Sequence, residues 1–131
     1  MLQLSIFLEN AKGRLAEALN LLAEFNVNIR ALSLADTKDY GVLRVIAENA
    51  EEIAEKLKVR NCVVKLTPVW VLKVPDQPGG LAKVLNKLVG EGVIVEYMYA
   101  FVERQNEQAQ VVIKVRDAEL MQAAIEKYQL K

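Results

Sequence analysis

The first residues of the chain alternate between apolar and polar side chains. From Leu2 to Leu8 every second residue is apolar, and this period of two predicts a strand with one buried face. Leucines then recur at helical spacing from Leu15 towards Phe25, which predicts a helix. The same two signals continue and predict strands over 29–34, 42–47 and 62–66, with a helix over 50–58 between the last two. The predicted order is therefore βαββαβ.

The second half of the chain gives the same order of signals. They predict a strand over 70–74, a helix over 81–89, a long strand over 93–103, a turn over 105–108, a strand over 111–115 and a helix capped by Asp117. Only residues 129–131 follow that helix, so we expect the second unit to lack most of its last strand. The sheet edge left open needs another cover, and we expect a homodimer to supply it.

An internal repeat supports this division. From Gly13 to Val27, a shift of 66 positions matches seven of fifteen residues. Self-similarity at a fixed offset indicates a duplicated unit. We therefore predict an α+β protein of two ferredoxin-like units, residues 1–68 and 69–131, each with an antiparallel sheet and helices on one face. The connection at residues 67–69 is so short that we expect the units to be packed side by side.

Composition excludes several functions. Lysine plus arginine and aspartate plus glutamate both number 17, without the basic excess of a nucleic-acid-binding protein. There is no histidine, so the commonest general base and metal ligand is absent, and we predict neither an enzyme nor a metal or cofactor site. The single cysteine, Cys62, fits a buried strand position and a reducing compartment. No signal peptide or membrane-length apolar stretch is evident, which predicts a cytoplasmic protein without membrane contact.

The loop before the predicted helix over 81–89 is the first candidate for chemistry. It contains two adjacent glycines and ends at a helix N-terminus, where free N–H groups favour an anion such as a carboxylate. Taken alone, it is better explained as a plain strand-to-helix turn. Asn28, just after the first helix, could bond a ligand or only its own turn. These alternatives stay open on the residues alone.

Together, these motifs resemble the ACT domain family. The second half has the form Asp-x-Pro-Gly-x-Leu from Asp76 to Leu81, followed by a leucine-rich helix and by Val93 at the start of the next strand. The first half has Gly13-Arg14-Leu15 and the sequence Val27-Asn28-Ile29, which is similar to the Asn-Ile signature of that family. The resemblance covers both halves and points to free-standing tandem ACT proteins.

The resemblance implies a non-catalytic module that binds an amino acid where two ACT units meet and that regulates a partner such as a metabolic enzyme. Carried onto this chain, one site would use Asn10, Ala11, Lys12, Gly13, Arg14, Leu15, Asn28 and Ile29, and the other Asp76, Gln77, Pro78, Gly79, Gly80 and Leu81. The first loop lacks the Asp and Pro of the family, and Ile94 stands in the second half where Asn28 stands in the first. This pattern is compatible with a single competent site that combines the loop of one half with the asparagine of the other, and equally with a second site that is silent. The alternative function is an assembly module that binds no small ligand.

Overall fold

The computed structural model describes residues 1–36, 39–103 and 106–130, and the chain divides into two compact units. The first unit is Leu2–Pro68, and the second is Val69–Lys131 together with Met1, whose carbonyl accepts a hydrogen bond from the Val69 N–H at 2.9 Å. The first unit contains β1 (Leu2–Glu9), α1 (Arg14–Glu24), β2 (Ala31–Asp36), β3 (Tyr40–Ile46), α2 (Ala50–Val59) and β4 (Val63–Pro68). The second contains β5 (Trp70–Pro75), α3 (Gly80–Gly90), β6 (Val95–Ala100), β7 (Gln108–Val115) and α4 (Ala118–Tyr128).

The first unit has the predicted βαββαβ order. Its four strands form an antiparallel sheet in the order β2-β3-β1-β4. The register places Ile6 between Leu43 of β3 and Val64 of β4, so apolar residues of three strands lie on one face. That face carries the buried residues Leu4, Ile6, Leu43 and Val45, which pack with Leu22 of α1 and Leu57 of α2. The expected ferredoxin-like arrangement is therefore confirmed for this unit.

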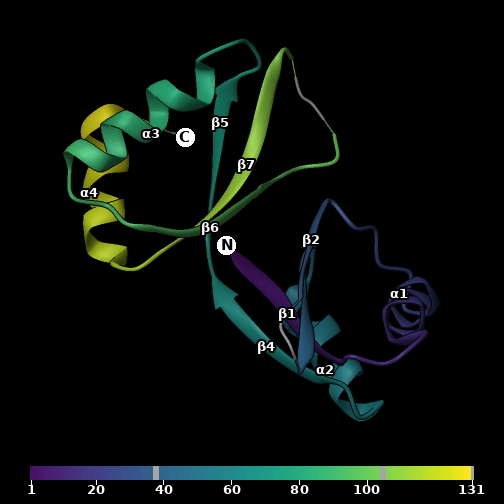
Figure 1. Ribbon diagram of the computed structural model, residues 1–131. Helices are drawn as coiled ribbons and strands as arrows, with labels where there is room; N and C mark the ends of the chain where they lie inside the picture. The colour runs from purple at the N-terminus through teal and green to yellow at the C-terminus, as the bar shows by residue number, and fades with distance from the viewer. Residues whose placement is uncertain (37–38, 104–105, 131) are drawn as a thin grey trace. The chain divides into compact units, whose positions relative to one another are not determined.

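The second unit repeats the arrangement but is short of its last strand, as predicted. Its described strands are antiparallel in the order β5-β7-β6, and α3 and α4 lie on the same side of them (Figure 1). Leu72 of β5 faces Val111 of β7, as Ile6 faces Leu43 in the first unit. On its other side, β1 is paired with β4, whereas β5 has no strand neighbour there within the described residues.

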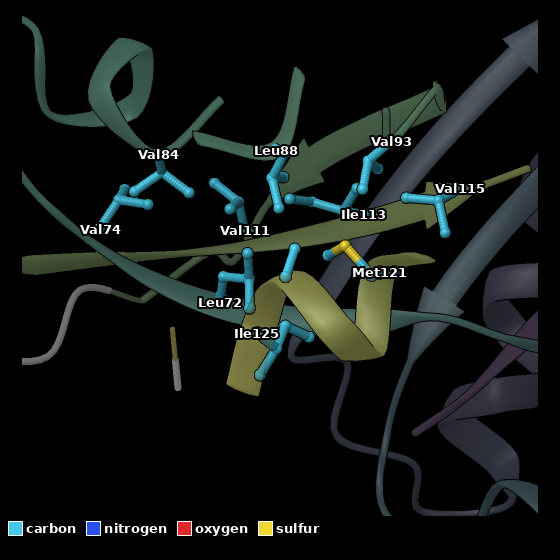
Figure 2. Packing of buried hydrophobic residues seen from close by; sticks show 11 residues of the cluster. Leu72, Val74, Val84, Leu88, Val93, Val111, Ile113, Val115, Met121 and Ile125 are labelled. Atoms are coloured by element: carbon cyan, nitrogen blue, oxygen red, sulfur yellow. The ribbon is translucent and has the colours of Figure 1, made fainter. Parts of the chain in front are cut away.

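Each unit has a hydrophobic core of its own. In the second unit, side chains from the sheet and from both helices meet in one cluster, which includes Leu72, Leu88, Ile113 and Met121 (Figure 2). Leu88 is fully buried in this cluster, and Leu22, 66 positions earlier, is fully buried in the first. The internal repeat of the sequence therefore corresponds to equivalent core positions.

Several predicted strand boundaries were wrong, among them those of the following two strands. The strand expected from Ile29 begins at Ala31, because the ladder to β3 starts only where the Arg30 N–H bonds the Ile46 carbonyl. The long strand expected over 93–103 is confined to Val95–Ala100. The Val93 N–H instead bonds the carbonyl of Leu88, which holds this residue against the end of α3. Thr37, Lys38 and Gln105 of the predicted turns lie outside the described residues.

The two predicted helix caps differ. Asp117 caps α4 as expected, because its carboxylate Oδ1 accepts hydrogen bonds from the N–H groups of Glu119 and Leu120. Asn49 holds the equivalent position before α2, but it has a left-handed backbone (φ 60°) and its side chain makes no capping bond. Cys62 lies one residue before β4 and is partly exposed, rather than buried within the strand.

A carboxylate beyond the end of α3 ties this helix to α4. Oε1 of Glu91 pairs with Nζ of Lys127 and accepts a hydrogen bond from the Tyr128 hydroxyl at 3.1 Å. The bond from Lys127 and then that from Tyr128 lower the pKa of Glu91 below its ordinary 4.5. A carboxyl with a lowered pKa contributes stability that is present above its unfolded-state pKa and is lost as the pH falls through the folded-state pKa.

We therefore expect Glu91→Gln to flatten the acid limb of the stability curve. The wild-type protein should lose more stability than the variant between about pH 5 and about pH 3, because only the wild type gives up this interaction on protonation. Urea unfolding at a series of pH values measures the difference. Glu103→Gln, which removes an exposed carboxylate outside the helices, is the control and should keep the wild-type acid limb. Parallel curves for Glu91→Gln and wild type would contradict the prediction.

Candidate ligand-binding site

The two loops that connect a strand to the first helix of each unit have the same two backbone hydrogen bonds. In the loop over 9–14, the Ala11 N–H bonds the Glu9 carbonyl at 2.8 Å, and the Arg14 N–H bonds the Ala11 carbonyl at 3.3 Å. In the loop over 75–80, Gln77 bonds Pro75 at 2.9 Å and Gly80 bonds Gln77 at 3.0 Å in the same way. These bonds coincide at a shift of 66, so the duplication extends to backbone geometry. We call these segments the first loop and the second loop.

One glycine in each loop is required by its conformation. Gly13 has φ 85° and ψ −5°, and Gly79 has φ 81° and ψ −6°. This left-handed region is unfavourable for residues with a Cβ atom, which explains why glycine recurs at both positions. Each glycine directly precedes a helix and cannot cap it with a side chain. The N–H groups of Arg14 and Gly80 bond within their loops, so the next N–H groups of α1 and α3, which have no side-chain cap, are the donors suited to an anion such as a carboxylate.

The next residue makes the two loops chemically different. Gly80 is buried, and a Cβ atom placed on it would lie 2.1 Å from the Pro75 carbonyl oxygen, so this loop closes only with glycine. Arg14 takes the equivalent position in the first loop. Its guanidinium pairs with Glu17 at 3.0 Å and with Glu9 at 3.2 Å, and these carboxylates, Glu17 foremost, raise the pKa of Arg14. At this position the first loop thus carries ion pairs, whereas the second has a buried glycine.

The remaining predicted residues of the first site lie at the other end of α1. Asn28 and Ile29 follow its C-terminus, and eleven helical residues separate them from the first loop, about 16 Å at 1.5 Å per residue. Within this unit, the structure therefore does not bring Asn28 together with Asn10–Leu15. Asn28 instead lines a crevice of about 450 Å³ with Asn26, Arg30, Glu48 and Asn49.

Sequence patterns did not predict this crevice, which lies between the turn after α1 and the start of α2. Its equivalent in the second unit, about 550 Å³, is lined by Ile94, Arg116 and Asp117. A third crevice, of about 320 Å³, lies beside the first loop and includes Glu9, Arg14 and Cys62. Periodicity cannot reveal such hollows, because each is formed by segments far apart in the sequence. The only signal was the asparagines at turn positions.

Within the described ranges, no three histidine, cysteine, aspartate or glutamate side chains gather closely enough to hold a metal ion. In the same ranges, none of the helices has the length and apolar character needed to span a bilayer.

Comparison with known families now identifies the chain. The model of the family described as the ACT domain pair matches residues 1–130. The chain belongs to the ACT domain pair family. ACT pairs are regulatory modules, and no catalytic family is indicated. The resemblance drawn from the loop and helix motifs is thereby confirmed over the full predicted extent.

Solved structures agree with this assignment. Protein BT0572 from Bacteroides thetaiotaomicron is 39% identical to this ACT domain pair, with a TM-score of 0.91 over 99% of this chain and 89% of that one. The regulatory subunit of aspartate kinase from Thermus thermophilus has a TM-score of 0.67 at 17% identity, over 95% of this chain and 87% of that one. The corresponding subunit from Thermus flavus has 0.65 at 18%, over 95% and 88%. At such identities the kinase subunits show a shared fold. A comparison with curated proteins found no match.

Proposed function

We propose that this ACT domain pair is a non-catalytic sensor that binds an amino acid at its glycine-bearing loops and regulates a partner, such as a metabolic enzyme. One observation carries the proposal. A left-handed glycine stands before the N-terminus of α1 and again before that of α3, and at neither helix end does a side chain cap the backbone N–H groups. Donors of this kind suit the carboxylate that every free amino acid carries.

The fold supports the regulatory part of the proposal. Two solved structures with the same fold are named as regulatory subunits of aspartate kinase. A regulatory module needs a ligand whose binding changes its stability or its surface, and it needs no catalytic groups of its own. We place the protein in the cytoplasm, in keeping with its single free cysteine, Cys62.

The test is a thermal-unfolding screen against each of the twenty amino acids. An amino acid present at about ten times its dissociation constant should stabilise the protein by about 1.4 kcal/mol and raise its melting temperature. A variant carrying Gly13→Asp and Gly79→Asp should lose this response, because a carboxylate at each loop repels that of the ligand. Aspartate tolerates the left-handed region better than most residues, and no atom lies within 4 Å of either added Cβ.

Gly90→Ala is the matched control, since it adds a methyl group in open space at the far end of α3. This variant should keep the wild-type response to amino acids. If no amino acid raises the melting temperature of the wild-type protein, the sensor function is refuted. If the double-aspartate variant responds as strongly as wild type, the ligand binds somewhere other than the loops.

A second candidate function, an assembly module without a small ligand, is favoured by the edge of β5. A groove of about 360 Å³ follows this edge and is lined by residues 69–73 and by Gln122 and Ile125 of α4. In the first unit, β4 occupies the equivalent side of β1. Open edges pair readily with strands of other chains, so a homodimer could form here. An amino acid screen without any response, together with a dimer in sedimentation, would favour this function over the sensor.

A further inference from the structure

The edge of β5 that faces away from β7 is open within the described residues, whereas β4 covers the equivalent edge of β1 in the first unit. We infer that this edge binds an extended segment of a partner protein, which runs antiparallel to β5 and places an apolar residue opposite Leu72 and an acidic residue opposite Lys73. Such docking does not depend on whether the loops bind an amino acid.

The outward backbone groups of β5 belong to Val71 and Lys73. In an antiparallel strand, the N–H and C=O of one residue point to the same side, and successive residues alternate. Directly after β5, the Asp76 N–H bonds the Glu107 carbonyl at 3.0 Å, so even-numbered residues of the strand turn towards β7 and odd-numbered ones turn away. Pro75 holds one outward position, where a proline in an edge strand is tolerated. Two N–H and two C=O groups of β5 are therefore offered to an incoming strand.

The first unit shows which side chain fits at the centre of this edge. Ile6 of β1, which stands 66 positions before Leu72, pairs with Val64 of β4, and Val64 packs against the core of its unit. In the second unit, a groove of about 360 Å³ follows the β5 edge and is lined by Trp70, Leu72 and Ile125 of α4, among others. An apolar side chain opposite Leu72 would pack in this groove as Val64 packs in the first unit.

Lys73 determines the charge that a partner segment should carry. Its side chain is exposed and is the one charged side chain among the described residues that line the groove. Across the described part of the chain, no carboxylate pairs with it. In an antiparallel pair, directly opposite residues have Cβ atoms about 5 Å apart on the same face, and opposite charges there are stabilising. An acidic residue is therefore the best match opposite Lys73.

A second copy of the chain matches this edge less well. Two β5 strands can use all their outward groups only with Leu72 opposite its counterpart, because the Val69 N–H is already bonded and Pro75 has none. That register places the two Lys73 residues diagonally on one face, about 7–8 Å apart. Since β5 contains no acidic residue, nothing in the paired strands compensates this repulsion. A partner segment with a carboxylate avoids it.

Binding of a synthetic peptide to the whole chain tests the inference. The probe is acetyl-Gly-Val-Glu-Val-Thr-Val-Gly-amide, and a matched peptide carries lysine in place of glutamate. NMR follows the amide shifts and hydrogen exchange of the protein. We expect the glutamate peptide to bind and to slow the exchange of the Val71 and Lys73 amides. The lysine peptide should bind about fivefold more weakly, the size expected for one cross-strand charge pair.

Substitutions in β5 separate the contribution of charge from that of the backbone. Lys73→Glu should weaken binding of the glutamate peptide about fivefold or more and should favour the lysine peptide. Lys83→Glu, the same change at an exposed position of α3 outside the groove, is the control and should keep the affinity within about twofold. Val71→Pro removes an outward N–H without removing a bond to β7, so it should abolish peptide binding while the circular dichroism spectrum is kept. The exchange at Lys73 decides the inference even if Val71→Pro fails to fold.

Three results would overturn this docking site. They are no binding of the glutamate peptide at about 1 mM, equal affinities for the two peptides, or protection of the Val71 and Lys73 amides in the free protein that increases with protein concentration. The third result would assign the edge to a second copy of the chain. None of them changes the response to amino acids, so the sensor function stands or falls separately.

Discussion

Replacing Gly80 by alanine is expected to destabilise the second unit by about 3 kcal/mol, at the upper end of the usual cost of overpacking. The added Cβ atom would lie 2.1 Å from the Pro75 carbonyl oxygen and 3.0 Å from its carbonyl carbon. Both are backbone atoms, so the clash cannot be relieved by turning a side chain. Either β5 or the start of α3 must move, and the second loop would lose the conformation proposed to bind the ligand.

Urea unfolding followed by circular dichroism measures this change. Gly90→Ala makes the same chemical change at the other end of α3, where no atom lies within 4 Å of the new Cβ. Alanine also has the higher helix propensity, so this control should be neutral or should stabilise by up to about 1 kcal/mol. The expected result is a loss of stability for Gly80→Ala and no loss for Gly90→Ala. Equal unfolding midpoints for Gly80→Ala and wild type would show that the loop does not approach the helix as closely as described.

Leu88→Ala is the second substitution from which we expect a large effect. Leu88 is fully buried among residues of β5, β7 and α4, and truncation to alanine would leave a cavity in the core of the second unit. Such substitutions cost about 2–5 kcal/mol. Fluorescence of Trp70 is a suitable probe, because this is the one tryptophan of the chain and it packs against the same core. The unfolding midpoint of the Leu88→Ala variant in urea should fall accordingly.

The neighbouring Val89 provides the control for this substitution. Its side chain is 69% exposed, so Val89→Ala on the same helix should change the stability by less than about 0.5 kcal/mol. Leu22→Ala tests the equivalent core position of the first unit and should cost a similar amount there, as seen by circular dichroism. If Leu88→Ala and Val89→Ala had the same effect, the helix would not pack as described.

Helices and strands were predictable wherever a local pattern reflects a buried face. The alternation from Leu2 to Leu8 follows from the pleat of β1, whose even residues face the helices, and the leucine spacing of α1 follows from its turn. Strand ends were less predictable, because they depend on partners elsewhere in the chain. Ile29 has the composition of a strand residue, but the ladder to β3 begins only at residues 30–31.

The sequence by itself determined the duplicated fold, the missing last strand and the two glycine-bearing loops, because all three depend on residues close together in the chain. A left-handed turn favours glycine at Gly13 and Gly79 whatever surrounds it. Only the tertiary structure decided how the loops differ. The approach of the Pro75 carbonyl to Gly80, the two carboxylates around Arg14 and the separation of Asn28 from the first loop all depend on how strand, loop and helix are placed in space. The periodicity of the sequence does not predict those distances.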